Sequence, residues 1–213
     1  MELLVSFAVY FAVLILAMSV HEFAHAWTAY RLGDTTALYS GRMTFNPLAH
    51  IDIFWTVLLP LLLFISTRTF IAAAKPVPIN YWGLKNPKRD MVLIGASGPL
   101  SNLVFAVILS LLLKSLPRVF FDYVFVQRLA YFILLLIYVN VMLAVFNMLP
   151  IPPLDGSRVL MGLLPEGLAS LYARIEPYGL FIILALFSVG MLDYIVRPLI
   201  TLILSLLGTG GSP

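Results

Sequence analysis

The chain has 213 residues, of which 62% are hydrophobic and 11% are charged, and its net charge is +3. An ordinary soluble domain is about 25% charged, so the composition predicts an integral membrane protein, organised as a single domain over residues 1–213. The absence of cysteine excludes disulfides, thiolate metal ligands and a cysteine nucleophile, and the absence of a basic patch interleaved with aromatic residues argues against nucleic-acid binding.

The first apolar run covers residues 3–32 and is long enough to cross a membrane at about 1.5 Å per residue. It carries His21, Glu22 and His25 near its end. On a helix, residues i and i+4 share a face, so both imidazoles can bind one metal ion. Glu22 can then act as a general base on a metal-bound water without being a ligand itself. Because ionisable groups inside a membrane are costly and mark functional sites, this motif predicts a metal-dependent hydrolase.

Two short segments between the apolar runs are predicted to be strands near the site. Residues 37–45 alternate in polarity, and residues 76–80 are extended by their prolines. Either strand could pair with an unwound substrate through its edge. The loop that follows holds Lys85, Lys88 and Arg89, and the positive-inside rule predicts that it is cytoplasmic.

The second apolar run, residues 51–74, is interrupted by Pro60 and by polar residues 66–69, so it can be a full crossing or a re-entrant segment. A re-entrant segment is the simpler solution. It would place loops 33–50 and 75–90 on the same cytoplasmic face as the metal.

The third run, residues 91–113, begins with small residues that allow a helix or metal site to approach closely, and it contains a buried amide, Asn102. The fourth run, residues 129–149, ends in a proline-rich stretch that cannot continue a helix, so the chain must unwind just before Asp155. Residues 178–207 fit one tilted helix or a hairpin broken at Gly190. The whole is predicted to be all-α with five to six transmembrane helices and a flexible tail over residues 208–213.

A catalytic zinc site normally has three protein ligands, so a third is needed. The candidates are His50, Asp52, Asp155 and Asp193. Asp155 is preferred because it alone sits on a proline-broken, glycine-flanked turn that can aim a carboxylate inward.

Three motifs now combine: His21-Glu22-xx-His25, Gly98-Pro99-xx-Asn102, and Asn147-xx-Pro150-xxxx-Asp155-Gly156. Together they resemble the signature motifs of the site-2 protease family of intramembrane zinc metalloproteases. Asn46-Pro47-xx-His50-x-Asp52 and Lys75-Pro76-Val77-Pro78 further resemble a compact prokaryotic branch without PDZ or other regulatory domains.

The resemblance implies one zinc ion per chain, bound by His21, His25 and Asp155, with Glu22 activating water. It implies cleavage of a peptide in or beside a transmembrane segment, in a multi-pass protein of a prokaryotic cell membrane, with the metal toward the cytoplasm. Asn102 and Asn147 can donate hydrogen bonds to a bound peptide or oxyanion, or can cap broken helices. His50 is a possible accessory residue.

The alternative function is a non-catalytic membrane protein that binds metal or a client helix, such as a pseudoprotease or transporter-like scaffold. A transporter would be expected to carry ligands at several depths or repeated halves. The residues here form one cluster that includes a candidate base. The natural substrate and the oligomeric state do not follow from the sequence.

Overall fold

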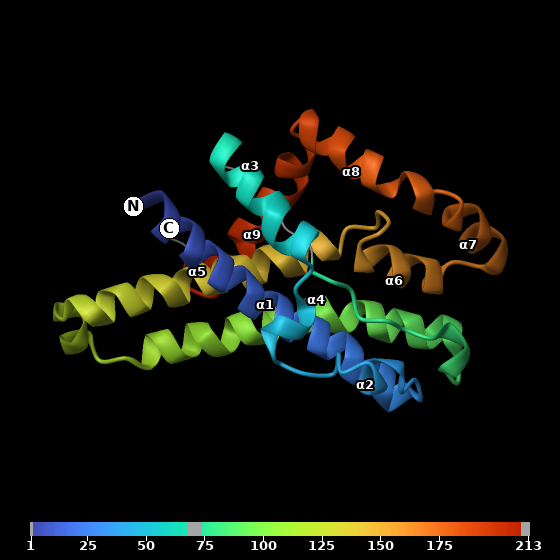
Figure 1. Ribbon diagram of the computed structural model, residues 1–213, viewed down its shortest axis with the longest axis horizontal. Coiled ribbons are helices and arrows are strands. Elements are labelled where there is room, and N and C mark those ends of the chain that lie inside the picture. The colour runs from blue at the N-terminus through green and yellow to red at the C-terminus, as the bar shows by residue number, and fades with distance from the viewer. Residues whose placement is uncertain (1, 68–73, 210–213) are drawn as a thin grey trace.

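The computed structural model describes residues 2–67 and 74–209, and in this part of the chain the regular elements are all helical (Figure 1). They are, in order, α1 (Glu2–Leu32), α2 (Thr36–Tyr39), η1 (Pro47–His50), η2 (Ile53–Leu58), α3 (Leu59–Thr67), η3 (Tyr81–Gly83), α4 (Pro87–Ser115), η4 (Arg118–Asp122), α5 (Val124–Asn147), α6 (Asp155–Leu163), α7 (Glu166–Ala173), η5 (Glu176–Tyr178), α8 (Gly179–Ser188) and α9 (Met191–Leu206).

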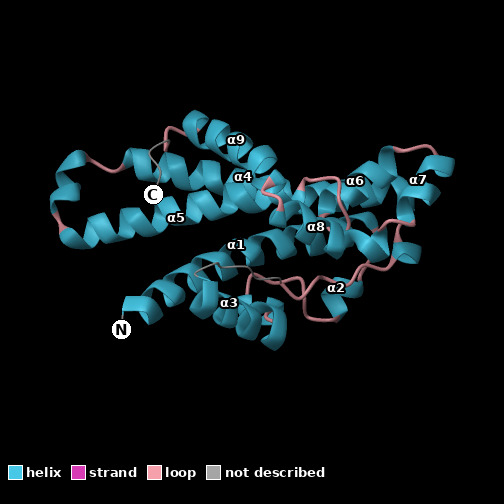
Figure 2. Ribbon diagram, turned by 90° about the horizontal axis from the view of Figure 1, so that it is seen from above, coloured by secondary structure: helices cyan, strands magenta, loops and turns pink. Residues whose placement is uncertain are grey.

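The core is formed by α1, α4 and α5, with α9 packed against α5 and α6 against α4 (Figures 1 and 2). Helix α5 contributes more buried apolar side chains than any other helix, and its run of Leu, Ile and Val has no polar stripe that would keep one face in water. Apolar side chains that face away from this core stay exposed along α4 and α8, as expected for surfaces that face lipid.

Four helical segments within the described residues are long and apolar enough to cross a membrane, where five to six were predicted. They are residues 4–32, 87–115, 124–147 and 166–188. The described part of residues 51–74 adds only the short helices η2 and α3, so the count of five to six stays a prediction.

Residues 51–74 begin and end at the same place. The backbone N–H of Lys75 donates to the carbonyl of His50 at 3.0 Å. Between them, η2 and α3 cover 6 and 9 residues, which is about 22 Å at 1.5 Å per residue, short of a core of about 30 Å. Phe64 of α3 packs on Phe7 of α1 with ring centroids 5.5 Å apart, so the segment reaches toward the N-terminal half of α1. Residues 68–73, also part of this run, lie outside the described residues.

The loops before and after this segment contact each other. The N–H of Asn80 donates to Asp34 Oδ2 at 2.7 Å. Loops 33–50 and 75–90 therefore lie together at the end of α1 that follows His25, which is the arrangement expected of a re-entrant segment.

The predicted strands are wrong for residues 37–45 and, as paired strands, for residues 76–80. Asp34 Oδ1 accepts from the N–H of Thr36 at 2.9 Å, which starts the helical turn α2. Gly41 ends it with a φ of 68°, where the N–H of Arg42 reaches the carbonyl of Ala37 at 2.8 Å. Residues 76–80 are free of helix, but hydrogen bonds from this segment go to side chains rather than to another strand.

The C-terminal half of the chain resolves two open predictions. Helix α5 ends at Asn147, and α6 begins at Asp155 after an irregular, proline-rich connection, as predicted. Residues 178–207 form two helices broken at Gly190, whose φ is 71°. Helix α9 then runs along α5 and ends beside α4, where Ser110 Oγ donates to the carbonyl of Leu207 at 2.8 Å. Residues 210–213 of the predicted flexible tail lie outside the described residues.

Candidate metal centre

Helix α1 and the start of α6 bring three predicted site residues together. His21 Nε2 lies 3.0 Å from Asp155 Oδ2, His25 Nε2 lies 3.2 Å from the same oxygen, and the two Nε2 atoms are 3.0 Å apart. All three side chains are buried. Within the described part of the chain this is the one His, Cys, Asp or Glu group that could hold a metal ion.

The three donor atoms form a triangle that suits zinc. Zinc binds imidazole nitrogen and carboxylate oxygen at about 2.0–2.2 Å with tetrahedral geometry, which places neighbouring donors about 3.3 Å apart. The observed edges of 3.0–3.2 Å need only a small outward adjustment to reach that separation. Two imidazoles and a carboxylate also match the donor set of catalytic zinc sites that keep a fourth position open.

Both histidines are oriented through their other ring nitrogen. His21 Nδ1 lies 2.6 Å from Asn102 Oδ1, and His25 Nδ1 lies 2.7 Å from the carbonyl of Ile94. Since a carbonyl oxygen only accepts, each Nδ1 carries a proton, which leaves Nε2 as the ring nitrogen that a metal ion would bind. This is the tautomer that a metal ligand needs.

Gly98 allows α4 to approach this closely. A Cβ at this position would contact His25 Nε2 and would lie 2.7 Å from His21 Nε2. Any side chain at position 98 would therefore occupy the space around the donor atoms. The predicted role of the small residues at the start of this run is confirmed for Gly98.

Glu22 lies one residue after the first histidine and is held by the segment that follows α3. Its Oε2 accepts a hydrogen bond from the backbone N–H of Val77 at 3.0 Å. Val77 is flanked by Pro76 and Pro78, which have no N–H, so it supplies the sole donor within these three residues. Glu22 is only partly buried, unlike the three clustered side chains.

Asp155 uses its two oxygens differently. Burial raises the pKa of this carboxyl group, but the imidazoles of His21 and His25 lower it more strongly, so the pKa lies well below its usual range. Oδ2 faces the histidines, whereas Oδ1 faces Arg158 Nη1 at 3.6 Å, one helical turn along α6. The anionic carboxylate is thus oriented from both sides.

The remaining predicted site residues lie outside the cluster. Asn102 is fully buried, and its amide donates to the carbonyl of Ala17 and to Asn140 Oδ1, which leaves no N–H for a substrate. Asn147 is the last residue of α5, and its amide donates to the carbonyl of Leu143 at 3.0 Å.

His50 and Asp52 serve the loop before η2. His50 is buried and donates from Nε2 to the carbonyl of Thr44 at 2.9 Å. Asp52 Oδ1 accepts from the N–H groups of Phe54 and Trp55 at 2.9 Å and so caps η2. The side chain of Asp193 lies outside the described residues.

Three residues near the site were not predicted from the sequence: Val77, Asn140 and Arg158. Asn140 had a usable signal, since it is a lone amide inside an apolar run. Arg158 had a weaker one, as a cation one turn after Asp155 on a helix. Val77 contributes only a backbone group, and side-chain chemistry gives no signal for that.

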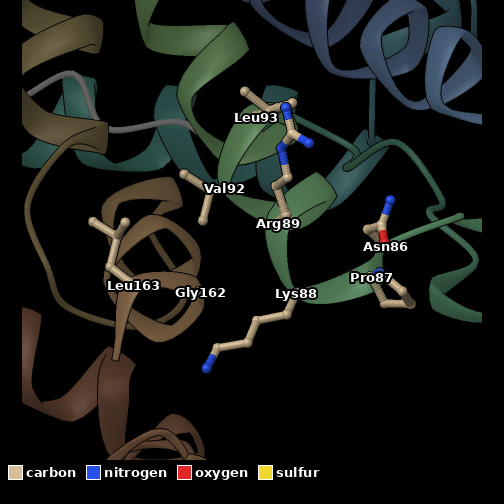
Figure 3. Close-up of a pocket in the computed structure, with 8 residues that line it drawn as sticks. All are labelled: Asn86, Pro87, Lys88, Arg89, Val92, Leu93, Gly162 and Leu163. Carbon is tan, nitrogen blue, oxygen red and sulfur yellow. The ribbon is translucent and has the colours of Figure 1, made fainter. Parts of the chain in front are cut away.

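A separate pocket of about 600 Å³ lies between the N-terminus of α4 and the end of α6 (Figure 3). Its lining includes Lys88, Arg89, Val92 and Gly162. Gly162 follows Asp155 by two helical turns, or about 10 Å along α6. The pocket is therefore distinct from the His21–His25–Asp155 cluster.

Comparison with known proteins places these residues in context. The model of Peptidase family M50 matches residues 7–190 of the chain. The Bacillus subtilis protein named "Putative zinc metalloprotease YwhC" is 36% identical over 189 residues, which cover 88% of this chain and 83% of that protein. Rip2 of Mycolicibacterium smegmatis, with the same description, is 30% identical over 175 residues, covering 81% of this chain and 63% of Rip2. No solved structure is significantly similar to the chain.

Proposed function

Because the chain belongs to peptidase family M50, the site-2 protease family of metalloproteases, we propose that it is an intramembrane zinc endopeptidase that cleaves membrane proteins in or beside their transmembrane segments. One observation carries the proposal. His21 and His25 lie beside Glu22 on a helix long and apolar enough to span a membrane, and Asp155 of α6 converges on them within 3.2 Å.

One zinc ion per chain would be held by His21 Nε2, His25 Nε2 and Asp155 Oδ2. When bound, zinc supplies a lowered pKa for the attacking water and polarises the scissile carbonyl. The sequence contains no cysteine, so the site offers only nitrogen and oxygen donors. Such donors favour hard and borderline cations, such as zinc, over soft ones.

Glu22 is the general base in this proposal. Its Oε2 is occupied by the N–H of Val77, which leaves Oε1 to take a proton from the attacking water. The same carboxyl group then delivers that proton to the nitrogen of the leaving amine as the peptide C–N bond breaks. Glu22 returns to its ionised form, the new carboxyl group passes the second water proton to the amine, and the products are a carboxylate and a protonated amine.

The membrane arrangement follows from the loops. Lys85 lies in the connection before α4, and Lys88 and Arg89 lie in the first turn of α4. Lys85 and Gly83 adjoin Gly33, so these cations are at the same end of the molecule as the C-terminal end of α1. The positive-inside rule places this end in the cytoplasm of a prokaryotic cell. The segment 51–74 is then re-entrant from that face, since His50 and Lys75 are hydrogen-bonded, and the metal centre lies toward the cytoplasmic side.

A transmembrane helix must unwind locally to present an extended peptide bond. We propose that Asn147, only partly buried at the end of α5, contacts such a peptide. We propose a different role for His50, which is buried in its loop. Its backbone carbonyl accepts from the N–H of Lys75, so His50 stabilises the start of segment 51–74.

The test is cleavage of a panel of model transmembrane substrates in proteoliposomes by the wild type, by Glu22→Gln and by Glu166→Gln. The last is a matched control, because Glu166 is exposed at the start of α7. We expect cleavage by the wild type and the control, loss of about 100-fold or more in Glu22→Gln, and similar zinc content in all three. Zinc content without cleavage of any substrate would favour the non-catalytic, metal-binding alternative.

A further inference from the structure

A chain of buried amides leads from the metal centre into the core of the helix bundle. Asn102 of α4 contacts His21 of α1 on one side and Asn140 of α5 on the other. Both asparagines are 0% exposed. Buried amides of this kind are costly unless each polar atom is paired, and here the pairing has a direction.

Two backbone carbonyls set that direction. Asn140 Nδ2 donates to the carbonyl of Leu136 at 2.8 Å, so Asn140 Oδ1 must face Asn102. Asn102 Nδ2 donates to this oxygen at 2.7 Å and to the carbonyl of Ala17 at 3.0 Å. Turning the Asn102 amide over would bring its oxygen against two other oxygens. Asn102 Oδ1 is therefore held toward His21.

The consequence reaches the metal ligand itself. With an acceptor fixed 2.6 Å from His21 Nδ1, Nδ1 keeps a proton, and Nε2, which faces Asp155, is the nitrogen left for the metal ion. We propose that Asn140, which touches neither metal nor substrate, is a positioning residue that selects the zinc-binding tautomer of His21 through Asn102. This inference rests on the zinc site of the proposed function.

The second histidine does not depend on this relay. His25 Nδ1 is held by the backbone carbonyl of Ile94 at 2.7 Å. Loss of Asn140 should therefore weaken one ligand of three and leave the other two in place. The expected result is weaker zinc binding rather than its abolition.

The experiment measures zinc affinity by chelator competition in detergent, using the wild type, Asn140→Leu, Asn102→Leu and the double variant. Outer partners of metal-ligating histidines typically contribute about 10- to 100-fold in affinity, so we expect a loss of about that size in Asn102→Leu. The loss in Asn140→Leu should be smaller but measurable, because the carbonyl of Ala17 still holds one N–H of Asn102. The double variant should bind zinc as weakly as Asn102→Leu alone, because the relay is already cut. Ser110→Ala is the control, since it removes a buried hydrogen bond of α4 remote from the metal ligands.

A second measurement separates positioning from packing. In zinc-loaded protein, ¹⁵N chemical shifts should show zinc on Nε2 and the proton on Nδ1 of His21 in the wild type, and a mixture of the two tautomers in Asn140→Leu. Wild-type zinc affinity and an unchanged tautomer in a folded Asn140→Leu protein would overturn the relay. A wild type that retains zinc but cleaves nothing would overturn the proposed protease and leave the relay standing.

Discussion

The two sides of α1 at residues 21–25 are built differently. The side that carries His21 and His25 is buried against α4 and α6, and every ring nitrogen has a fixed neighbour. The side that carries Glu22 is partly open and is held by one backbone N–H from a proline-flanked segment. Metal ligands are thus fixed by helix packing, whereas the proposed base is fixed by a loop.

The largest effect is expected from filling the space on the buried side. Gly98→Ala places a methyl group against His25 Nε2 and 2.7 Å from His21 Nε2, where the backbone of α4 cannot easily retreat. We expect loss of stoichiometric zinc and of cleavage, measured by metal analysis and substrate assay.

The control for this change is Gly167→Ala in α7. A Cβ there would meet nothing within 4 Å, so zinc content and activity should match the wild type. Retention of zinc and activity by Gly98→Ala would show that α4 does not pack on the donor atoms as described.

An intermediate effect is expected on the open side. Val77→Pro removes the N–H that donates to Glu22 Oε2, and a hydrogen bond to a charged group contributes about 1.5 kcal/mol or more. We expect kcat to fall about 10-fold while zinc content stays the same, because no metal ligand is touched. The measurement is steady-state cleavage with metal analysis on the same samples.

Val77→Ala is the matched variant, since it removes most of the buried side chain and keeps the N–H. Equal kcat values for Val77→Pro and Val77→Ala would mean that the N–H does not position Glu22. A change confined to KM would assign the segment to substrate binding instead.

The smallest effect is expected where a ligand is held by backbone. Ser97 Oγ lies 3.4 Å from His25 Nδ1, at the limit of a hydrogen bond, and it donates to the carbonyl of Ile94 at 2.7 Å. Since Ile94 itself holds His25, Ser97→Ala should change zinc affinity by less than about three-fold. A larger loss by chelator competition would show that the hydroxyl group, rather than the carbonyl, orients His25.

Much of the buried side could be predicted from sequence. The i, i+4 spacing of His21 and His25, the proline-broken turn before Asp155 and the small residues around Gly98 each report a local property, and each is found at the place where it was expected. Residue spacing on a helix and the inability of proline to continue one are short-range constraints, so a single sequence contains them.

The open side was predicted less well because it depends on non-local partners. The alternation in residues 37–45 favoured a strand, but Asp34 and Gly41 impose a helical turn and its termination. Residues 76–80 were expected to form a strand edge, yet the N–H groups of Val77 and Asn80 bind carboxylates of Glu22 and Asp34. Pairing between distant segments leaves little trace in either segment alone.

The number of crossings shows the same limit. Hydropathy identified each apolar run. It could not distinguish a segment that crosses the membrane from a re-entrant segment that returns to the same face. The hydrogen bond between Lys75 and His50 is a contact between residues 25 positions apart, and it became visible only in the folded chain.

The most direct test of the central claim is X-ray absorption spectroscopy at the zinc edge on purified wild-type protein, with His25→Gln and His50→Gln beside it. We predict about one zinc per chain with nitrogen and oxygen ligands at about 2.0–2.2 Å and the outer-shell scattering of two imidazoles. His25→Gln should lose one imidazole, and His50→Gln should lose none. Two results would contradict the assignment of His21, His25 and Asp155 as the metal ligands. One is a zinc coordination shell without imidazole scattering, and the other is imidazole scattering that is reduced in His50→Gln but not in His25→Gln.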